Sequence, residues 1–185
     1  IQQPPGGVWA RADAELFRLW ERGSYAVVGT PAPGGKLTAP PQEQLERRMA
    51  LADIVLIEAD GAKRMPCKVP AAHEPVLLPQ CDIVLAVAGL SALGQPLEKA
   101  CFRAELAQQL LNVPGNTALT PVLLAKLLAS ENGGRKAVGA RRFYAVLNQA
   151  DTEERTALAR KTADFLKMQY GVPCVLTHFE EGERA

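Results

Sequence analysis

The sequence predicts an α/β fold of the doubly wound class with a mainly parallel sheet. Residues 53–59 and 82–89 are nearly continuous aliphatic runs, and such runs are typical of parallel strands covered on both faces. Shorter strand-like and helix-like segments alternate along the rest of the chain, which favours the same class. The 185 residues suffice for one core, so we expect residues 1–185 to form a single α/β domain.

The first part of the chain is expected to hold short elements. These are a helix over residues 12–22, a strand over 25–29, a loop over 30–41 and a helix over 42–51. Leu16, Leu19 and Trp20 share one face of the first helix, and Gly23 follows its end. Prolines and glycines crowd residues 30–41, which predicts a loop there.

The remaining elements surround the second aliphatic run. Prolines recur through residues 60–80 and predict a long irregular loop. Thr120 and Pro121 supply an N-cap and a first-turn proline for a helix that reaches residue 129. The other expected elements are a helix over 97–111, a loop over 132–139, a strand over 143–147, a helix over 152–170 and a strand over 172–177.

Composition and charge exclude several classes of protein. The formal net charge is +1, and the apolar runs are shorter than the roughly 18 residues that a membrane span needs, so we expect neither a nucleic-acid nor a membrane partner. The four cysteines are scattered, with no CxxC pair, and there are two histidines. This pattern indicates neither a zinc module nor a disulfide framework, and it favours a cytoplasmic protein.

Two acidic residues stand at the end of the first aliphatic run. Glu58 and Asp60 precede Gly61, and ligands of open parallel sheets bind beyond the carboxyl ends of the strands. Asp60 is therefore a candidate magnesium ligand, and Glu58 a second carboxylate of a nucleotide-hydrolysing site. The alternative is that Asp60 and Gly61 only form a turn.

A second candidate site follows the strand expected over residues 143–147. Asn148 and Asp151 have the spacing of the Asn-Lys-x-Asp motif that reads guanine, although Gln149 stands where the lysine would be. The alternative is a helix start, in which Asp151 is the N-cap and Glu154 completes a capping box. Residues 89–94 (GLSALG) either allow the backbone to come close to a bound ligand or simply form a connecting loop.

No phosphate-binding loop is found in the sequence. The segment GTPAPGGK at residues 29–36 has the wrong glycine spacing, is followed by Leu37 rather than serine or threonine, and runs into prolines. We therefore expect a nucleotide-binding fold whose first strand and phosphate loop are missing from this chain. On this view the chain begins part way into its gene product.

A family resemblance supports this interpretation. Residues 58–76 read EADGAKRMPCKVPAAHEPV, which resembles the signature of the YqeC-like proteins, accessory factors of selenium-dependent molybdenum hydroxylases. The likeness continues through residues 87–97, the pair Gly133 and Gly134, and residues 147–151. It implies a P-loop nucleoside triphosphatase-like fold with the phosphate loop upstream of Ile1.

The resemblance also implies roles for particular residues. Asp60 and Glu58 would organise magnesium and catalysis, and Asn148 and Asp151 would face the base of GTP or ATP. Nucleotide would also contact Gly61 and Lys63. The loop from Lys63 to His73 would sense nucleotide or hold an anionic cargo, and its candidate binding residues, with the adjoining glutamate, are Arg64, Lys68, His73 and Glu74.

Three functions are therefore open. The leading one is a nucleotide-binding accessory protein, a GTP or ATP hydrolase when complete, that acts with Mg²⁺ in maturation of a selenium-dependent molybdenum hydroxylase or in insertion of its selenium cofactor. The alternative is a non-catalytic docking or cofactor-carrier module on a degenerate nucleotide-binding fold. The third is a thiol-dependent selenium transferase that uses Cys67, which lies between basic residues.

Overall fold

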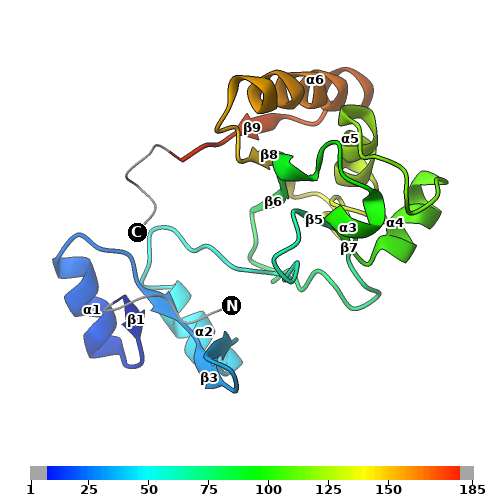
Figure 1. Ribbon diagram of the computed structural model, residues 1–185. Coiled ribbons are helices and arrows are strands. Elements are labelled where there is room, and N and C mark those ends of the chain that lie inside the picture. Colours follow the sequence, from blue (N-terminus) through cyan, green and yellow to red (C-terminus); the bar gives the residue numbers. More distant parts are fainter. Residues whose placement is uncertain (1–7, 180–185) are drawn as a thin grey trace. The chain divides into compact units, whose positions relative to one another are not determined.

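The computed structural model describes residues 8–179 (Figure 1). The chain divides into two compact units, one ending at Glu58 and the other beginning at Ala59, and each is described by itself. Both mix helices with short strands, and three of the four small sheets contain only parallel pairs. The α/β class and the mainly parallel pairing are thus confirmed. The expectation of a single domain stays a prediction.

The first unit holds two pairs of short strands and two helices. Its elements are β1 (Trp9–Ala10), α1 (Asp13–Glu21), β2 (Val27–Val28), β3 (Thr30–Ala32), β4 (Lys36–Thr38) and α2 (Gln42–Met49). Both expected helices are confirmed. The expected loop over residues 30–41 instead contains an antiparallel hairpin of β3 and β4. Gly34 and Gly35 have φ of 75° and 67°, which suits a tight hairpin turn and agrees with our rejection of this segment as a phosphate loop.

A buried arginine joins the two helices of the first unit. Arg48 is only 5% exposed, its Nε donates to Asp13 Oδ1 at 2.8 Å, and its Nη2 donates to the Arg11 carbonyl at 3.0 Å. Arg47 reaches the other carboxylate oxygen of Asp13, also at 2.8 Å. A buried guanidinium is tolerated only when it is paired in this way.

The strand expected over residues 53–59 is wrong. Among residues 8–179 no strand pairs with this segment, and Ile54 and Leu56 are 82% and 87% exposed. Aliphatic composition favours a strand, but a strand also requires a neighbouring edge that completes its hydrogen bonds. Glu58 therefore does not interrupt a buried strand, and it is exposed.

The second unit is built on a three-stranded parallel sheet in the order β6-β8-β9. These strands are β6 (Ile83–Gly89), β8 (Arg142–Asn148) and β9 (Cys174–Leu176), and all three were expected. Gly89 pairs with Asn148, and Leu147 pairs with Leu176. The carboxyl ends of the strands therefore lie at one edge of the sheet.

Helices α5 (Pro121–Ala129) and α6 (Glu153–Tyr170) lie together along this sheet (Figure 1). As predicted, the Thr120 hydroxyl caps α5, because it accepts a hydrogen bond from the Leu123 amide at 3.3 Å. Alternate residues of β8 are buried, whereas Leu85 and Val87 of β6 are 51% and 58% exposed. The second helix layer of a doubly wound fold stays a prediction.

The helix expected over residues 97–111 is broken in the middle. It consists of α3 (Leu97–Ala100), strand β7 (Cys101–Phe102) and α4 (Ala104–Leu111). Strand β7 pairs in parallel with β5 (Cys67–Lys68), which lies within the otherwise irregular loop expected over residues 60–80. Arg103 has φ of 63°, and a left-handed residue cannot continue a right-handed helix.

Candidate functional site

Three loops of the second unit meet at the carboxyl edge of the sheet. The loop after β6 is joined to the loop after β8 because the Ser91 amide donates to Gln149 Oε1 at 3.1 Å. The Gly89 amide donates to the Pro66 carbonyl at 2.7 Å, so the loop that contains the predicted anion-binding residues reaches the same edge. This is the position at which ligands bind to open parallel sheets.

The close approach of these loops depends on Gly89. A Cβ at this position would lie 2.7 Å from Gln149 Oε1 and 3.2 Å from the Pro66 Cβ. Gln149 itself has φ of 71°, a conformation that is costly for a residue with a side chain. The segment of residues 89–94 thus contacts the loop after β8 and positions it, while an approach of its backbone to a ligand stays a prediction.

Asn148 braces the loop that follows β8. Its Oδ1 accepts hydrogen bonds from the Gln149 amide at 2.8 Å and from the Thr177 hydroxyl at 2.9 Å. These bonds join the loop after β8 to the residue that follows β9. The amide side chain is therefore occupied in shaping the loop.

Asp151 is not the N-cap of α6, so the capping alternative is wrong. The cap is Thr152, whose hydroxyl accepts from the Arg155 amide at 3.2 Å. Asp151 Oδ1 instead accepts from the Phe179 amide at 3.2 Å, and its Oδ2 lies 3.7 Å from Arg155 Nη1. The carboxylate thus lies beside the start of α6, and the capping hydroxyl is that of Thr152.

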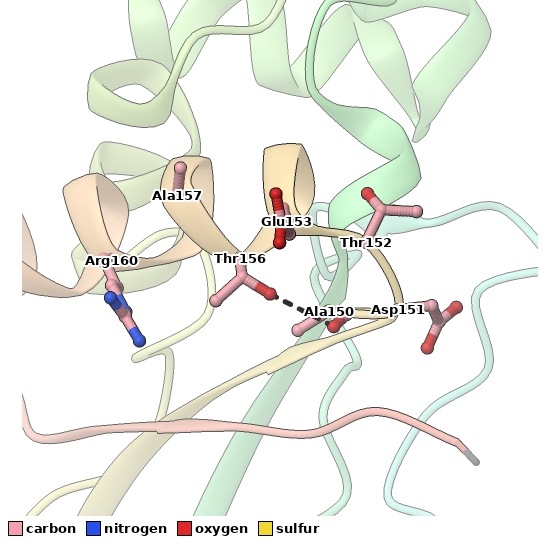
Figure 2. Close-up of a pocket in the computed structure, with 7 residues that line it drawn as sticks. All are labelled: Ala150, Asp151, Thr152, Glu153, Thr156, Ala157 and Arg160. Atoms are coloured by element: carbon pink, nitrogen blue, oxygen red, sulfur yellow. Dashed lines mark hydrogen bonds between the residues drawn. The ribbon is translucent and has the colours of Figure 1, made fainter.

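An open pocket of about 400 Å³ lies at the start of α6. Figure 2 shows its lining, with Asp151 and Arg160 at opposite ends and a hydrogen bond of 3.2 Å from the Thr156 hydroxyl to the Ala150 carbonyl. Threonine hydroxyls, two acidic groups and one basic group line a single concave surface. The lining residues are Ala150, Asp151, Thr152, Glu153, Thr156, Ala157 and Arg160.

Glu74 is the centre of a charged cluster in the same unit. Arg103 donates to both of its carboxylate oxygens, from Nη1 to Oε2 at 2.8 Å and from Nη2 to Oε1 at 3.0 Å. Lys68 Nζ lies 2.8 Å from Glu74 Oε2 and 3.0 Å from Asp60 Oδ2. The hydrogen bonds from Arg103 lower the pKa of Glu74 to about 2, against the opposing effect of burial.

Cations also surround the ring of Phe102, next to this cluster. Arg103 Cζ lies 4.4 Å from the ring centroid, Lys63 Nζ 4.8 Å and Lys68 Nζ 5.9 Å. These distances are within the range of cation–π attraction. Phe102 and Arg103 were not among the expected site residues, because both fall within a segment with amphipathic helical periodicity.

Only some residues of the predicted anion-binding loop belong to this cluster. Lys68 belongs to it and also donates to the Gly61 carbonyl at 3.0 Å. Arg64 is exposed and has φ of 64°. The His73 side chain is 80% exposed, with Nε2 3.9 Å from Glu74 Oε1, so it lies at the margin.

The comparisons with known proteins bear on this loop. A family model described as YqeC protein matches residues 8–105, which is just over half of the 185 residues. The chain belongs to the YqeC family. The matched range includes the charged cluster and ends before Asn148.

A curated relative is also known for this YqeC-family chain. The chain is 48% identical over 42 residues to the protein described as uncharacterized protein YqeC from Escherichia coli strain K12. That match covers 23% of the chain and 16% of the relative's length. No solved structure matches the chain.

A cluster of metal ligands and a membrane-spanning helix are both absent from residues 8–179 of this YqeC-family chain. Within that range no group of three or more His, Cys, Asp or Glu side chains could hold a metal ion. Asp60 could supply one carboxylate to Mg²⁺, which commonly takes its other ligands from phosphate oxygens and water. None of the helices in the same range is both long and apolar enough to cross a membrane.

The cysteines are less scattered than the sequence suggested. Cys67 and Cys101 are partners in the register of β5 and β7, and they are 4% and 1% exposed. The hydrogen bond with Cys101, together with burial, raises the pKa of the Cys67 thiol. A thiol with a raised pKa is a poor nucleophile, which argues against Cys67 as a selenium transferase residue.

Proposed function

We propose that the chain is the nucleotide-binding part of an accessory protein that acts in maturation of selenium-dependent molybdenum hydroxylases. In this proposal GTP or ATP binds with Mg²⁺ at the carboxyl edge of the β6-β8-β9 sheet. The hydroxylase or its maturation machinery is the partner. Membership of the YqeC family supports the choice of pathway, through the resemblance described above.

The observation that carries the nucleotide proposal is the meeting of three loops at one sheet edge. The bond from Ser91 to Gln149 and the bond from Gly89 to Pro66 hold these loops together where parallel sheets bind ligands. Asn148 braces the loop after β8, so Asp151 is displayed on a fixed backbone. A carboxylate in this position can accept hydrogen bonds from the edge of a base.

The charged cluster supplies a second part of the proposal. Lys68 and Arg103 already neutralise Glu74, while Lys63 lies over Phe102 on the exposed side of the loop. In the proposal, Lys63 and Arg64 provide the first attraction for phosphate groups, and Gly61 allows the backbone to approach. Asp60 then contributes a carboxylate to Mg²⁺.

One observation favours the alternative of a non-catalytic docking or cofactor-carrier module. Asp60 Oδ2 lies 3.0 Å from Lys68 Nζ, so the carboxylate proposed for Mg²⁺ is already paired. Glu58, the other proposed catalytic acid, is exposed and follows an irregular segment. A carrier needs neither residue for chemistry.

Calorimetric titration of the full-length protein tests the proposal. We expect GTP or ATP to bind with Mg²⁺, and Asp60→Asn to weaken the magnesium-dependent part several-fold. Asp164→Asn, an exposed change on α6, is the matched control and should bind as the unmodified protein does. Absence of binding for both nucleotides would leave the carrier module as the better account.

The proposed pathway needs a separate test. Deletion of the gene should lower the selenium content and activity of a selenium-dependent molybdenum hydroxylase in the same cells, and the unmodified gene should restore both. Full hydroxylase activity in the deletion strain would contradict the pathway and leave the nucleotide result unaffected.

A further inference from the structure

Cys67 and Cys101 occupy facing positions in a parallel strand pair. Strands β5 and β7 are two residues long, and their register aligns Cys67 with Cys101 and Lys68 with Phe102. Both thiols are buried. In the second pair, Lys68 belongs to the charged cluster and Phe102 lies next to it, so the two cysteines directly precede these residues in the chain.

The geometry of such a pair fits a disulfide. Neighbouring strands are about 4.7–4.9 Å apart, within the roughly 4.4–6.8 Å between Cα atoms that a disulfide spans. Residues paired in register project to the same side of the strands. The Cys67 Sγ lies 3.2 Å from the carbonyl of Ala100, the residue before Cys101, which places it close to its partner.

We propose that Cys67 and Cys101 are an oxidisable dithiol that a hydroperoxide converts into an intrachain disulfide. The Cys101 thiolate attacks the peroxide, its sulfur is oxidised to the sulfenic acid, and the O–O bond breaks with release of water. The Cys67 sulfur then attacks the sulfenic sulfur and a second water leaves. Two thiols and one hydrogen peroxide thus give one disulfide and two waters.

Cys101 is the first nucleophile because the two thiols are unequal. The hydrogen bond from Cys67 lowers the pKa of Cys101, whereas the pKa of Cys67 is raised. Burial slows the reaction, so it proceeds when the two-residue strands open locally.

The disulfide would fasten β5 to β7 behind the charged cluster. Lys68 and Phe102 immediately follow the two cysteines, and Arg103 comes next. In the reduced protein these residues are held by short strands and ion pairs. In the oxidised protein a covalent bond fixes the spacing of Lys68 and Arg103 around Glu74.

The other two cysteines lie elsewhere and can be replaced without touching the pair. Cys81 and Cys174 are half-buried, and their Sγ atoms lie near the carbonyls of Ile83 and Val175, at 3.2 Å and 3.9 Å, within their own segments. Replacing both with serine leaves the Cys67 and Cys101 pair intact.

The experiment uses the full-length protein with Cys81→Ser and Cys174→Ser. After treatment with hydrogen peroxide we expect the intact mass to fall by two hydrogens, with no uptake of iodoacetamide by the unfolded chain. A reductant should restore two alkylation sites. The oxidised form should melt roughly 5–10 °C higher than the reduced form, as expected for a closed loop of this kind.

A third change, Cys67→Ala, provides the matched control. The remaining Cys101 should then form no intrachain disulfide, and its sulfenic acid should be trapped by dimedone. The proposal is overturned if the two-serine protein keeps two alkylatable thiols, gains oxygen as sulfinic acid, or forms only disulfides between chains. All three outcomes are measured on the protein with Cys81→Ser and Cys174→Ser, in which Cys67 and Cys101 are unchanged.

Discussion

Arg103 holds Glu74 through two parallel hydrogen bonds of 2.8 and 3.0 Å. The guanidinium fork matches the two carboxylate oxygens, the strongest arrangement available to such a pair. Arg103 also donates to the Val69 carbonyl at 3.2 Å, so the same side chain fixes both the acid and the backbone of its loop. The residues are 29 positions apart in the sequence, and their contact ties α4 to the loop of the YqeC signature.

We expect Glu74→Gln to destabilise the protein by about 2–3 kcal/mol at neutral pH, because it leaves Arg103 and Lys68 without their shared charge. The pKa of Glu74 falls from its ordinary 4.5 to about 2 in the folded protein. A carboxyl group with a lowered pKa stabilises the fold above pH 4.5 and loses that contribution as the pH falls toward 2. Urea unfolding between pH 7 and pH 3 should therefore show a smaller acid-dependent loss for the variant.

Asp164→Asn is the control for this measurement, because Asp164 is an exposed acid on α6. It should leave both the neutral-pH stability and the acid-dependent loss nearly unchanged. An equal acid response of Glu74→Gln and the unmodified protein would mean that Glu74 is not held ionised by Arg103.

A second prediction concerns the contact between Gly89 and Gln149. Gly89→Ala should cost about 1–3 kcal/mol, because the new Cβ would stand 2.7 Å from Gln149 Oε1. The backbone itself is not the obstacle, since φ of −82° suits alanine. In a Gln149→Ala background the collision disappears, and Gly89→Ala should be clearly less costly. A double-mutant cycle by chemical unfolding measures the difference, and strictly additive effects would contradict the contact.

The sheet of the second unit could be predicted because its strands are marked by local pattern. Residues 82–89 and 143–147 are aliphatic runs, and they pair as expected. Residues 53–59 have the same composition but no strand partner among residues 8–179. A run of hydrophobic residues indicates which residues prefer burial. Whether the run forms a strand depends on whether another strand edge is available for hydrogen bonding.

The charged cluster could be predicted only in part. Lys68, Glu74 and Asp60 lie within one stretch of sequence, and they do come together. Phe102 and Arg103 are brought in by the long-range pairing of β5 with β7, which interrupts a segment with good helical periodicity. Local propensity does not include contacts between distant segments, and this is why the interruption of the expected helix over residues 97–111 was not predicted.

A third prediction separates Thr152 from Asp151 at the start of α6. Thr152→Ala should destabilise the protein by about 1 kcal/mol, because the hydroxyl that caps the helix is lost. Asp151→Asn should have little effect on thermal stability, since an amide oxygen can still accept from Phe179. Melting curves of the two variants test the assignment. A larger loss for Asp151→Asn would return the capping role to Asp151.

The last prediction tests whether Asp151 reads a base, and it rests on the proposed nucleotide site. If its carboxylate accepts hydrogen bonds from the edge of guanine, Asp151→Asn should weaken GTP binding by about 1.5–3 kcal/mol, the scale of hydrogen bonds to a charged group. This corresponds to roughly 10–150-fold in affinity. ATP binding should hardly change, because adenine does not present the same donors.

Titration of both nucleotides against the unmodified protein and Asp151→Asn distinguishes the possibilities. Asn148 holds the loop through Gln149 and Thr177, and neither bond involves Asp151, so the variant keeps the loop while changing its charge. Equal losses for GTP and ATP would mean that Asp151 acts on a part common to both nucleotides. Equal affinities for GTP and ATP in the unmodified protein would mean that Gln149, which bonds to Ser91, marks a site without guanine selectivity.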